Sequence, residues 1–348
     1  MKIPVLSSPL WVGIHVTNDC NLKCKHCVYN SGSNNIPENS LKLKEIKEII
    51  DQLEIMGVIT VEFLGGEPFT YPHLQEIIDY AYDKSLKVVI NTNGIAIPSN
   101  WFSKNRNKVF LMKMSLDGHN EQTHDSFRGI TGAFNKSIKS IKKAVDSGYD
   151  VCLITTLHDK NRIYINEIID KAKDLGVRTF TITTFVPLGR GEKIENYKIN
   201  KYDLKDLLIS IEKKKLEFRE KGISCNVKEE LPQTIAISKE LQNTFKDSKF
   251  RTCTGGFTQM SISSDGFAHP CTTLFNADSF DNDVRKRNIE DIWKKSELFT
   301  KWRDRTKLKG KCSKCSFLNL CGGGCRYIAY TLEGDINASD PYCAYEET

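Results

Sequence analysis

The 348-residue chain lacks any apolar run near the ~20 residues that a membrane-spanning helix requires. Its first ten residues contain one lysine and no long apolar core, so a secretory signal is not expected. Internal repeats and low-complexity tracts are also lacking. Apolar residues at 39% and charged residues at 27% are ordinary for a globular protein and exclude disorder of the whole chain. These absences favour a cytoplasmic protein with no membrane partner.

A strong charge of one sign is lacking as well. The net charge is only +6, which gives little support for a nucleic-acid partner. One segment, residues 301–314, is locally basic, with seven Lys or Arg residues and the single acid Asp304. It is either a solvated face or a docking surface for an acidic partner, such as a flavodoxin- or ferredoxin-like reductant.

Cysteine, by contrast, is abundant, with 12 residues. Disulfides are not expected in the cytosol, so metal ligation or catalysis is the better explanation. Three cysteines lie near the start and seven lie within the last 96 residues, which indicates two separate metal regions. The positions are 20, 24, 27, 152, 225, 253, 271, 312, 315, 321, 325 and 343.

The first half of the chain alternates between strand-like and helix-like segments, which indicates an α/β fold. We expect strands at 11–17, 58–64, 88–92, 109–115, 151–157 and 179–186. Helices are expected at 41–56, 74–84, 133–147 and 164–175. Such alternation predicts a parallel sheet whose carboxyl edge binds the ligand. We expect residues 1–190 to form this domain, 191–250 a helical connector, and 251–348 a cysteine-rich domain.

The first cysteine cluster has the spacing Cys20-x3-Cys24-x2-Cys27. Three thiolates on one loop can hold three corners of a [4Fe–4S] cluster and leave the fourth iron open for a chelating substrate. A zinc site that includes His26, or three buried structural thiols, are the alternatives.

The second region reads Cys312-x2-Cys315-x5-Cys321-x3-Cys325, with Cys343 after it and Cys253 and Cys271 before it. Seven thiols can hold two four-iron clusters with one ligand missing; zinc or unligated thiols are the alternatives. Cys152 lies in an apolar strand and is expected in the core. Cys225 is either the missing ligand or another buried thiol.

The first loop resembles the signature of the radical SAM superfamily, whose open iron binds S-adenosylmethionine (SAM). Three further motifs follow successive strands, as they do in that family: Gly65-Gly66-Glu67-Pro68, Thr92-Asn93-Gly94 and Ser115-Leu116-Asp117-Gly118. The resemblance implies a partial (β/α)6 TIM-like barrel in which these motifs bind SAM. It places Glu67 at the SAM ammonium, Ser115 and Asp117 near the ribose, and His26 beside the adenine.

Two other segments belong to the same part of the chain. Arg190, after the sixth strand, is expected to bind the SAM carboxylate or the substrate, unless it is simply exposed to solvent. The stretch His124-Asp125-x2-Arg128-Gly129 also resembles a segment that recurs in the family, and we expect it to be structural.

The second cysteine region resembles the SPASM domain, an extension with short β-hairpins and helices. The resemblance implies that Cys253, Cys271 and Cys325 hold a first auxiliary cluster. It implies that Cys312, Cys315, Cys321 and Cys343 hold a second one. Three [4Fe–4S] clusters and SAM are therefore the expected cofactors.

The resemblance implies that the enzyme cleaves SAM reductively to a 5′-deoxyadenosyl radical, which abstracts hydrogen from the substrate. Auxiliary clusters favour net oxidation, so we expect an oxidoreductase that modifies a ribosomally synthesised peptide. The alternative is a small molecule, such as a tetrapyrrole decarboxylated in haem synthesis, or another cofactor precursor. An electron-transfer protein and a zinc-based nucleic-acid binder are hypotheses of other classes.

Overall fold

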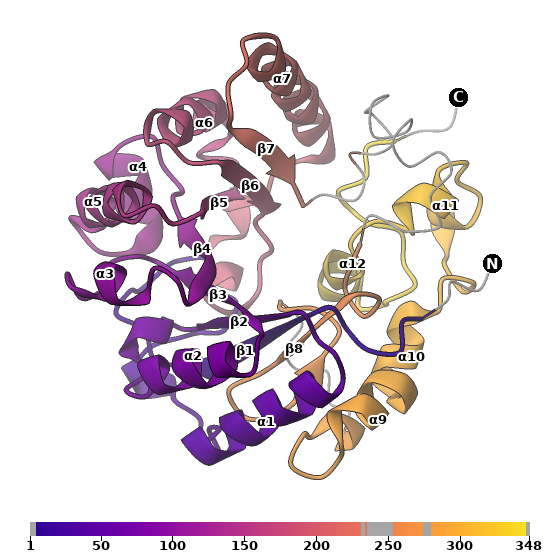
Figure 1. Cartoon of the computed structure of the whole chain (residues 1–348). Helices are drawn as coiled ribbons and strands as arrows, with labels where there is room; N and C mark the ends of the chain where they lie inside the picture. The colour runs from indigo at the N-terminus through magenta and orange to yellow at the C-terminus, as the bar shows by residue number, and fades with distance from the viewer. Residues whose placement is uncertain (1–4, 231–233, 235–252, 274–279, 346–348) are drawn as a thin grey trace.

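The computed structural model describes residues 5–230, 234, 253–273 and 280–345. These residues form a nine-stranded sheet in the order β7-β6-β5-β4-β3-β2-β1-β8-β9. Strands β1 to β7 are parallel and curve into an open barrel, with helices on its outer face (Figure 1). The strands are β1 (Trp11–Thr17), β2 (Thr60–Gly65), β3 (Lys87–Thr92), β4 (Val109–Ser115), β5 (Val151–Leu157), β6 (Thr179–Thr184), β7 (Asn226–Glu229), β8 (Gln259–Ile262) and β9 (Ala268–His269).

Each outer helix buries one apolar stripe against the sheet. In α1, apolar side chains recur at helical spacing at Ile46, Ile49, Ile50 and Leu53, and all four are buried. None of the helices in the described ranges is both long and apolar enough to cross a bilayer. The helices are α1 (Leu43–Ile55), α2 (Leu74–Asp83), α3 (Trp101–Asn105), α4 (Glu121–Arg128), α5 (Ala133–Asp146), α6 (Ile165–Asp174), α7 (Lys201–Glu220), α9 (Ile289–Lys295), α10 (Glu297–Arg303), α11 (Leu318–Cys321) and α12 (Arg326–Glu333).

The six strands expected from the sequence are confirmed, with ends that differ by one or two residues. The expectation that residues 191–250 form only a helical connector is wrong. Asn226–Glu229 forms β7, which extends the sheet by pairing parallel with β6. This four-residue strand has one buried apolar residue, Val227, so its sequence carries almost no strand pattern. Residues 231–233 and 235–252 of the expected connector lie outside the described residues.

Alternation along the parallel strands divides their side chains between two environments. In β1, Val12, Ile14 and Val16 belong to the apolar core. The intervening positions point into the barrel, where the Trp11 indole nitrogen donates to a Glu62 carboxylate oxygen at 2.7 Å. The barrel interior is therefore partly polar, although the sheet itself rests on an apolar core.

The C-terminal region is joined to the barrel through β8, which pairs parallel with β1 and places Ile262 opposite Ile14. Strands β8 and β9 form an antiparallel hairpin, as expected for this region. Two side chains tie the regions further: the Trp293 indole nitrogen donates to the Leu6 carbonyl at 2.9 Å, and the Tyr342 hydroxyl donates to the Phe185 carbonyl at 3.0 Å. Helix α9 of the C-terminal region also lies beside α1 of the barrel (Figure 1).

Ile262→Ala tests this junction. The Ile262 side chain is 0% exposed, so truncation should lower the free energy of unfolding by about 2–5 kcal/mol. Ile55→Ala is the matched control, because Ile55 is 83% exposed and should change the value by less than about 0.5 kcal/mol. Urea unfolding followed by circular dichroism measures both, and equal effects would show that β8 is not packed on the barrel.

Candidate active site

A cavity of about 340 Å³ lies at the carboxyl ends of the barrel strands. One wall carries Cys20, Cys24 and Cys27 from the loop after β1. The opposite wall includes residues of the C-terminal region, Thr272, Thr273 and Tyr327 among them. The motifs that the sequence places at successive strand ends therefore meet at one edge, as parallel strands require.

The cysteine loop presents its three sulfurs to N–H groups. The backbone N–H of Leu22 donates to Cys20 Sγ at 3.4 Å, and that of Ser31 donates to Cys27 Sγ at 3.3 Å. Arg128 Nη1 lies 3.8 Å from Cys24 Sγ. Burial raises the pKa of the Cys20 thiol to about 12, so ligation by a thiolate must displace a proton. Hydrogen-bonded sulfurs of this kind suit cluster ligands.

The two glycines at the end of β2, Gly65 and Gly66, lie directly against the start of the cysteine loop. The N–H groups of Gly66 and Glu67 donate to the carbonyls of Thr17 and Asp19, both at 2.8 Å. A Cβ on Gly66 would lie only 2.0 Å from the Asp19 carbonyl oxygen, so no larger residue fits. The glycines are thus needed for the close packing of this turn against Thr17–Asp19, whether or not they also contact a ligand.

Glu67 is fully buried behind this wall and does not line the cavity. Its carboxylate accepts hydrogen bonds from the Phe69 N–H, the Thr92 hydroxyl and the Asn93 N–H at 2.6–3.1 Å. Burial raises the pKa of Glu67 to about 7, although these three donors oppose the shift. The geometry therefore supports a structural role for Glu67, rather than the direct contact with the SAM ammonium expected from the sequence.

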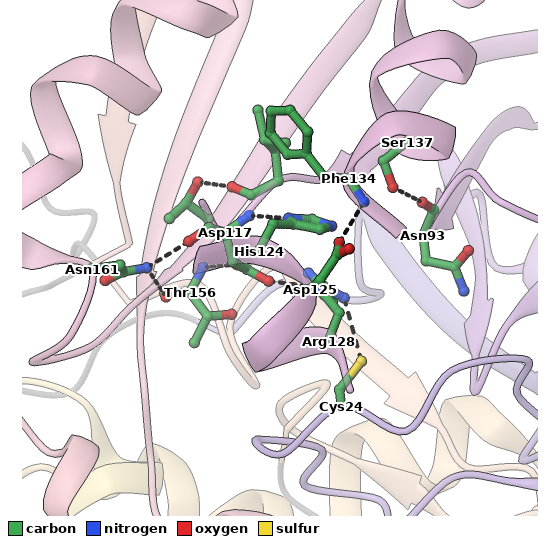
Figure 2. A network of polar contacts seen from close by, with 12 residues as sticks. Cys24, Asn93, Asp117, His124, Asp125, Arg128, Phe134, Ser137, Thr156 and Asn161 are labelled. Carbon is green, nitrogen blue, oxygen red and sulfur yellow. Dashed lines mark hydrogen bonds and ion pairs between the residues drawn. The ribbon is translucent and has the colours of Figure 1, made fainter. Parts of the chain in front are cut away.

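Asp117 is likewise buried and bonded within the protein (Figure 2). Its Oδ1 accepts from the Thr156 N–H at 2.7 Å, and its Oδ2 forms an ion pair with Arg128 Nε at 2.5 Å. His124 Nδ1 accepts from the Asp117 N–H at 3.1 Å, and Asn161 donates to the Asp117 carbonyl. Both carboxylate oxygens thus have partners within the protein, and Asp117 itself does not line the cavity.

The remaining SAM residues expected from the sequence divide into two groups. Pro68, which begins a short 3₁₀ helix, does not line the cavity, and neither do Glu67 and Asp117. Those that line the cavity are His26, Gly65, Gly66, Asn93, Ser115 and Arg190.

The His26 ring is neutral and forms part of the cavity wall. It stacks on Phe127 with centroids 4.0 Å apart, and burial holds the pKa of His26 well below its ordinary value. Its Nδ1 is buried and has no hydrogen-bond partner within the described residues, so it is available to a bound ligand. This unpartnered atom fits a ligand with a polar donor, such as the amine of an adenine.

Arg190 lines the cavity but is held by the cysteine loop. Its Nε and Nη1 donate to the backbone carbonyls of Cys24 and Ser31, both at 2.8 Å. Arg190 therefore orders this loop, and the solvent-exposed alternative is wrong because the residue is part-buried in these bonds.

Sequence reasoning missed an ion pair inside the barrel. Lys113 Nζ lies 2.9 Å from a Glu62 carboxylate oxygen and 4.7 Å from the centroid of the Trp11 ring. Glu62 and Lys113 both line the cavity. The available signal was a charged residue at an alternating position within each of two otherwise apolar parallel strands.

The second cysteine set surrounds its own cavity, lined by Cys312, Cys315, Cys321 and Cys343. The Gly324 N–H donates to Cys321 Sγ at 3.1 Å. Gly323 has φ +89°, and Gly324 has φ +76° and a Cβ there would lie 2.3 Å from an Asp340 carboxylate oxygen, so neither position tolerates a side chain. These four thiols are the ones expected to hold the second auxiliary cluster.

Cys253, Cys271 and Cys325 form the third set. Burial raises the pKa of the Cys325 thiol well above its ordinary value, and neighbouring Asp340, Cys253 and Cys271 raise it further. The influence of both other thiols on Cys325 indicates that the three lie near one another. Cys271 directly precedes Thr272 and Thr273, so this set adjoins the large cavity.

The last two cysteines lie in the barrel wall. Cys152 is buried in β5, as expected. Cys225 is buried in the core directly before β7, at the amino end of that strand, and the Cys152 thiol contributes to its raised pKa. The cavity lies at the opposite, carboxyl end of the strands, so Cys225 is placed with Cys152 and away from the third set.

Within the described ranges, no three His, Cys, Asp or Glu side chains converge on a point that could hold a single metal ion. A zinc site needs such convergence. A four-iron cluster instead binds each thiolate at a separate iron, so its ligands are spread around a cavity. Cys20, Cys24 and Cys27 line one cavity and Cys312, Cys315, Cys321 and Cys343 line another, an arrangement that suits cluster ligands.

Comparison with known proteins gives two family matches. A model of the radical SAM superfamily matches residues 14–172, and a model of the SPASM iron–sulfur cluster-binding domain matches residues 253–316. An AdoMet-dependent heme synthase of Oleidesulfovibrio alaskensis is 31% identical, over 95% of this chain and 86% of that protein.

Two further proteins are similar. The antilisterial bacteriocin subtilosin biosynthesis protein AlbA of Bacillus subtilis is 28% identical, over 90% of this chain and 67% of that protein. The crystal structure of Streptococcus suis SuiB bound to S-adenosylmethionine has the same fold, with a TM-score of 0.80 and 20% identity, over 98% of this chain and 78% of that one.

Iron content tests the division of the cysteines. Cys325→Ala should lower the iron bound after anaerobic reconstitution by roughly four atoms per chain, from roughly twelve, because it removes a ligand of one four-iron cluster. Cys225→Ala is the matched control and should leave the content unchanged, because its thiol lies in the barrel wall. A loss of iron in the Cys225 variant would contradict its placement.

Proposed function

The chain belongs to the radical SAM superfamily and carries a SPASM iron–sulfur cluster-binding domain, and on this premise we propose that it oxidatively modifies a ribosomally synthesised peptide. Enzymes of this superfamily use SAM and [4Fe–4S] clusters. When bound, these cofactors supply a 5′-deoxyadenosyl radical that removes a hydrogen atom from the substrate.

The proposed cofactor residues follow from the three cysteine sets. Cys20, Cys24 and Cys27 would hold the SAM-binding cluster. Cys253, Cys271 and Cys325 would hold the first auxiliary cluster, and Cys312, Cys315, Cys321 and Cys343 the second. SAM would lie against the cavity-lining residues His26, Gly65, Gly66, Asn93, Ser115 and Arg190.

The observation that carries the proposal is the charge state of the cavity lining. Each cation that lines the cavity within the described ranges is already bound: Lys113 by Glu62, Arg128 by Asp117, and Arg190 by two backbone carbonyls. A substrate with several carboxylates would need free cations here.

The rest of the polar lining contains the carboxyl group of Glu230, the three thiols and His26, and is otherwise neutral. The neutral part includes amide and hydroxyl side chains, which suit the N–H and C=O groups of a peptide backbone. They are Asn91, Asn93, Ser115, Thr156, Thr183, Thr184, Gln259, Thr272 and Thr273.

The oxidative outcome is supported by the position of the third cysteine set. Cys271 is followed in the chain by the lining residues Thr272 and Thr273, and Tyr327, two residues after Cys325, also lines the cavity. A redox group held by these cysteines would therefore lie beside the bound substrate.

A second candidate is the decarboxylation of a tetrapyrrole in haem synthesis. It is favoured by the similarity to the heme synthase of Oleidesulfovibrio alaskensis, which covers more of that relative's length than the similarity to AlbA does. The occupied cations of the cavity count against it, because the reacting propionate is itself a carboxylate.

Formation of 5′-deoxyadenosine separates the two candidates. The holoenzyme is mixed with SAM and dithionite, and either a peptide encoded beside its gene or iron coproporphyrin III is added. We expect the peptide to raise 5′-deoxyadenosine several-fold above the rate without substrate and to lose two hydrogen atoms by mass spectrometry. Cys24→Ala should form none. Loss of carbon dioxide from the porphyrin, with an inert peptide, would overturn the proposal.

We also propose that a flavodoxin- or ferredoxin-like reductant docks beside the second auxiliary set. Four lysines of the basic segment, Lys307, Lys309, Lys311 and Lys314, are exposed there, and Lys311 lines the cavity of that set. Arg303 and Arg305 of the same segment are not part of this face. Arg303 donates to the Gly256 and Trp293 carbonyls, and Arg305 is buried.

Charge reversal tests the docking face. The variant Lys307→Glu with Lys314→Glu should slow turnover supported by reduced flavodoxin about tenfold at low salt, because opposite charges steer encounter. Turnover supported by dithionite should not change. Lys136→Glu with Lys139→Glu, two exposed lysines of α5, is the charge-matched control. Equal slowing in both variants would show that the face is not specific.

A further inference from the structure

Arg128 is a buried cation with two partners among the described residues. Its side chain, at the end of α4, forms the ion pair with Asp117, and its Nη1 lies 3.8 Å from Cys24 Sγ. The residue is only 8% exposed. Figure 2 shows the guanidinium between the Asp117 carboxylate and the Cys24 sulfur.

A purely structural role does not account for this arrangement. The attachment of α4 to the cysteine loop is already made by the backbone, where the Lys25 N–H donates to the Phe127 carbonyl at 2.9 Å. Gly129 adds close packing, since a Cβ there would lie 2.3 Å from the Lys23 carbonyl oxygen. The loop is therefore held without the guanidinium, whereas burial of an ion pair carries a large desolvation cost.

Asp117 is held in place by hydrogen bonds that do not involve Arg128. The Thr156 N–H holds its Oδ1, and Asn161 and His124 hold its backbone carbonyl and N–H. A fixed carboxylate sets both the position and the direction of the guanidinium. The arginine that contacts the sulfur is thus oriented by the Ser115–Gly118 motif, although Asp117 itself does not reach the cavity.

We propose that Arg128 is a positioning residue that raises the reduction potential of the cluster ligated by Cys24. Reduction adds one electron to the cluster and makes its sulfurs more negative. An N–H donor and a positive charge at the Cys24 sulfur stabilise that reduced state. The inference depends on the superfamily membership but not on the identity of the substrate, so failure of the peptide proposal leaves it unaffected.

The test is the midpoint potential of this cluster in the reconstituted holoenzyme. The electron paramagnetic resonance signal that changes when SAM is added identifies the cluster among the three and is followed during redox titration. Arg128→Gln should make reduction about tenfold less favourable, a shift of about −59 mV for one electron. Arg128→Lys, which keeps the charge but loses the planar donor, should shift the potential in the same direction by less.

Lys25→Gln is the matched control. It removes one positive charge from the same loop, but from an exposed side chain next to Cys24, so the potential should stay at the wild-type value. Iron content confirms that each variant carries the cluster. If Arg128→Gln takes up no iron, the midpoint potential of Arg128→Lys tests the proposal instead.

Three results would overturn the proposal. The first is an unshifted potential in the glutamine variant. The second is an unshifted potential in the lysine variant where the glutamine variant takes up no iron. The third is a loss of SAM affinity in the glutamine variant with the potential unchanged, because Arg128 would then bind SAM rather than act on the sulfur.

Discussion

The packing of the Gly65–Glu67 turn against Thr17–Asp19 is the constraint on which the site depends. It brings the end of β2 within backbone hydrogen-bond distance of the segment that leads into Cys20. The Glu67 carboxylate then joins this turn to the end of β3 through Thr92 and Asn93. Three successive strand ends are thereby fixed relative to the first cysteine loop, and the cavity forms where they meet.

The same packing explains why the C-terminal region adjoins the site. Strand β8 pairs with β1, so the segment after the β8–β9 hairpin returns to the cavity at Cys271 and Thr272. The chain then closes with α12 and Tyr342, which is bonded to the loop after β6. One cavity therefore lies between two cysteine sets, which is the arrangement that the proposed oxidative chemistry would use. Arg128 links the barrel side of this cavity to the first set.

Local signals explain what the sequence could predict. The cysteine spacings, the motifs after the strands and the six barrel strands each occupy a short segment, and the structure brings them to one edge. Contacts between distant segments were not predictable: Arg128 and Cys24 are 104 residues apart, and Lys113 and Glu62 are 51 apart. Strand β7 was missed because its four residues carry one apolar side chain. The pairing of β8 with β1 was missed because neither strand has a sequence feature that specifies its partner.

Iron-edge anomalous diffraction from anaerobic crystals grown with SAM is the most direct test of the central claim, that ten cysteines are divided among three clusters, two of which adjoin the large cavity. We expect three separate iron sites, beside Cys24, Cys325 and Cys321, with SAM against Gly65 and Gly66. Fewer iron sites, or iron bound by Cys225 or Cys152, would contradict this division.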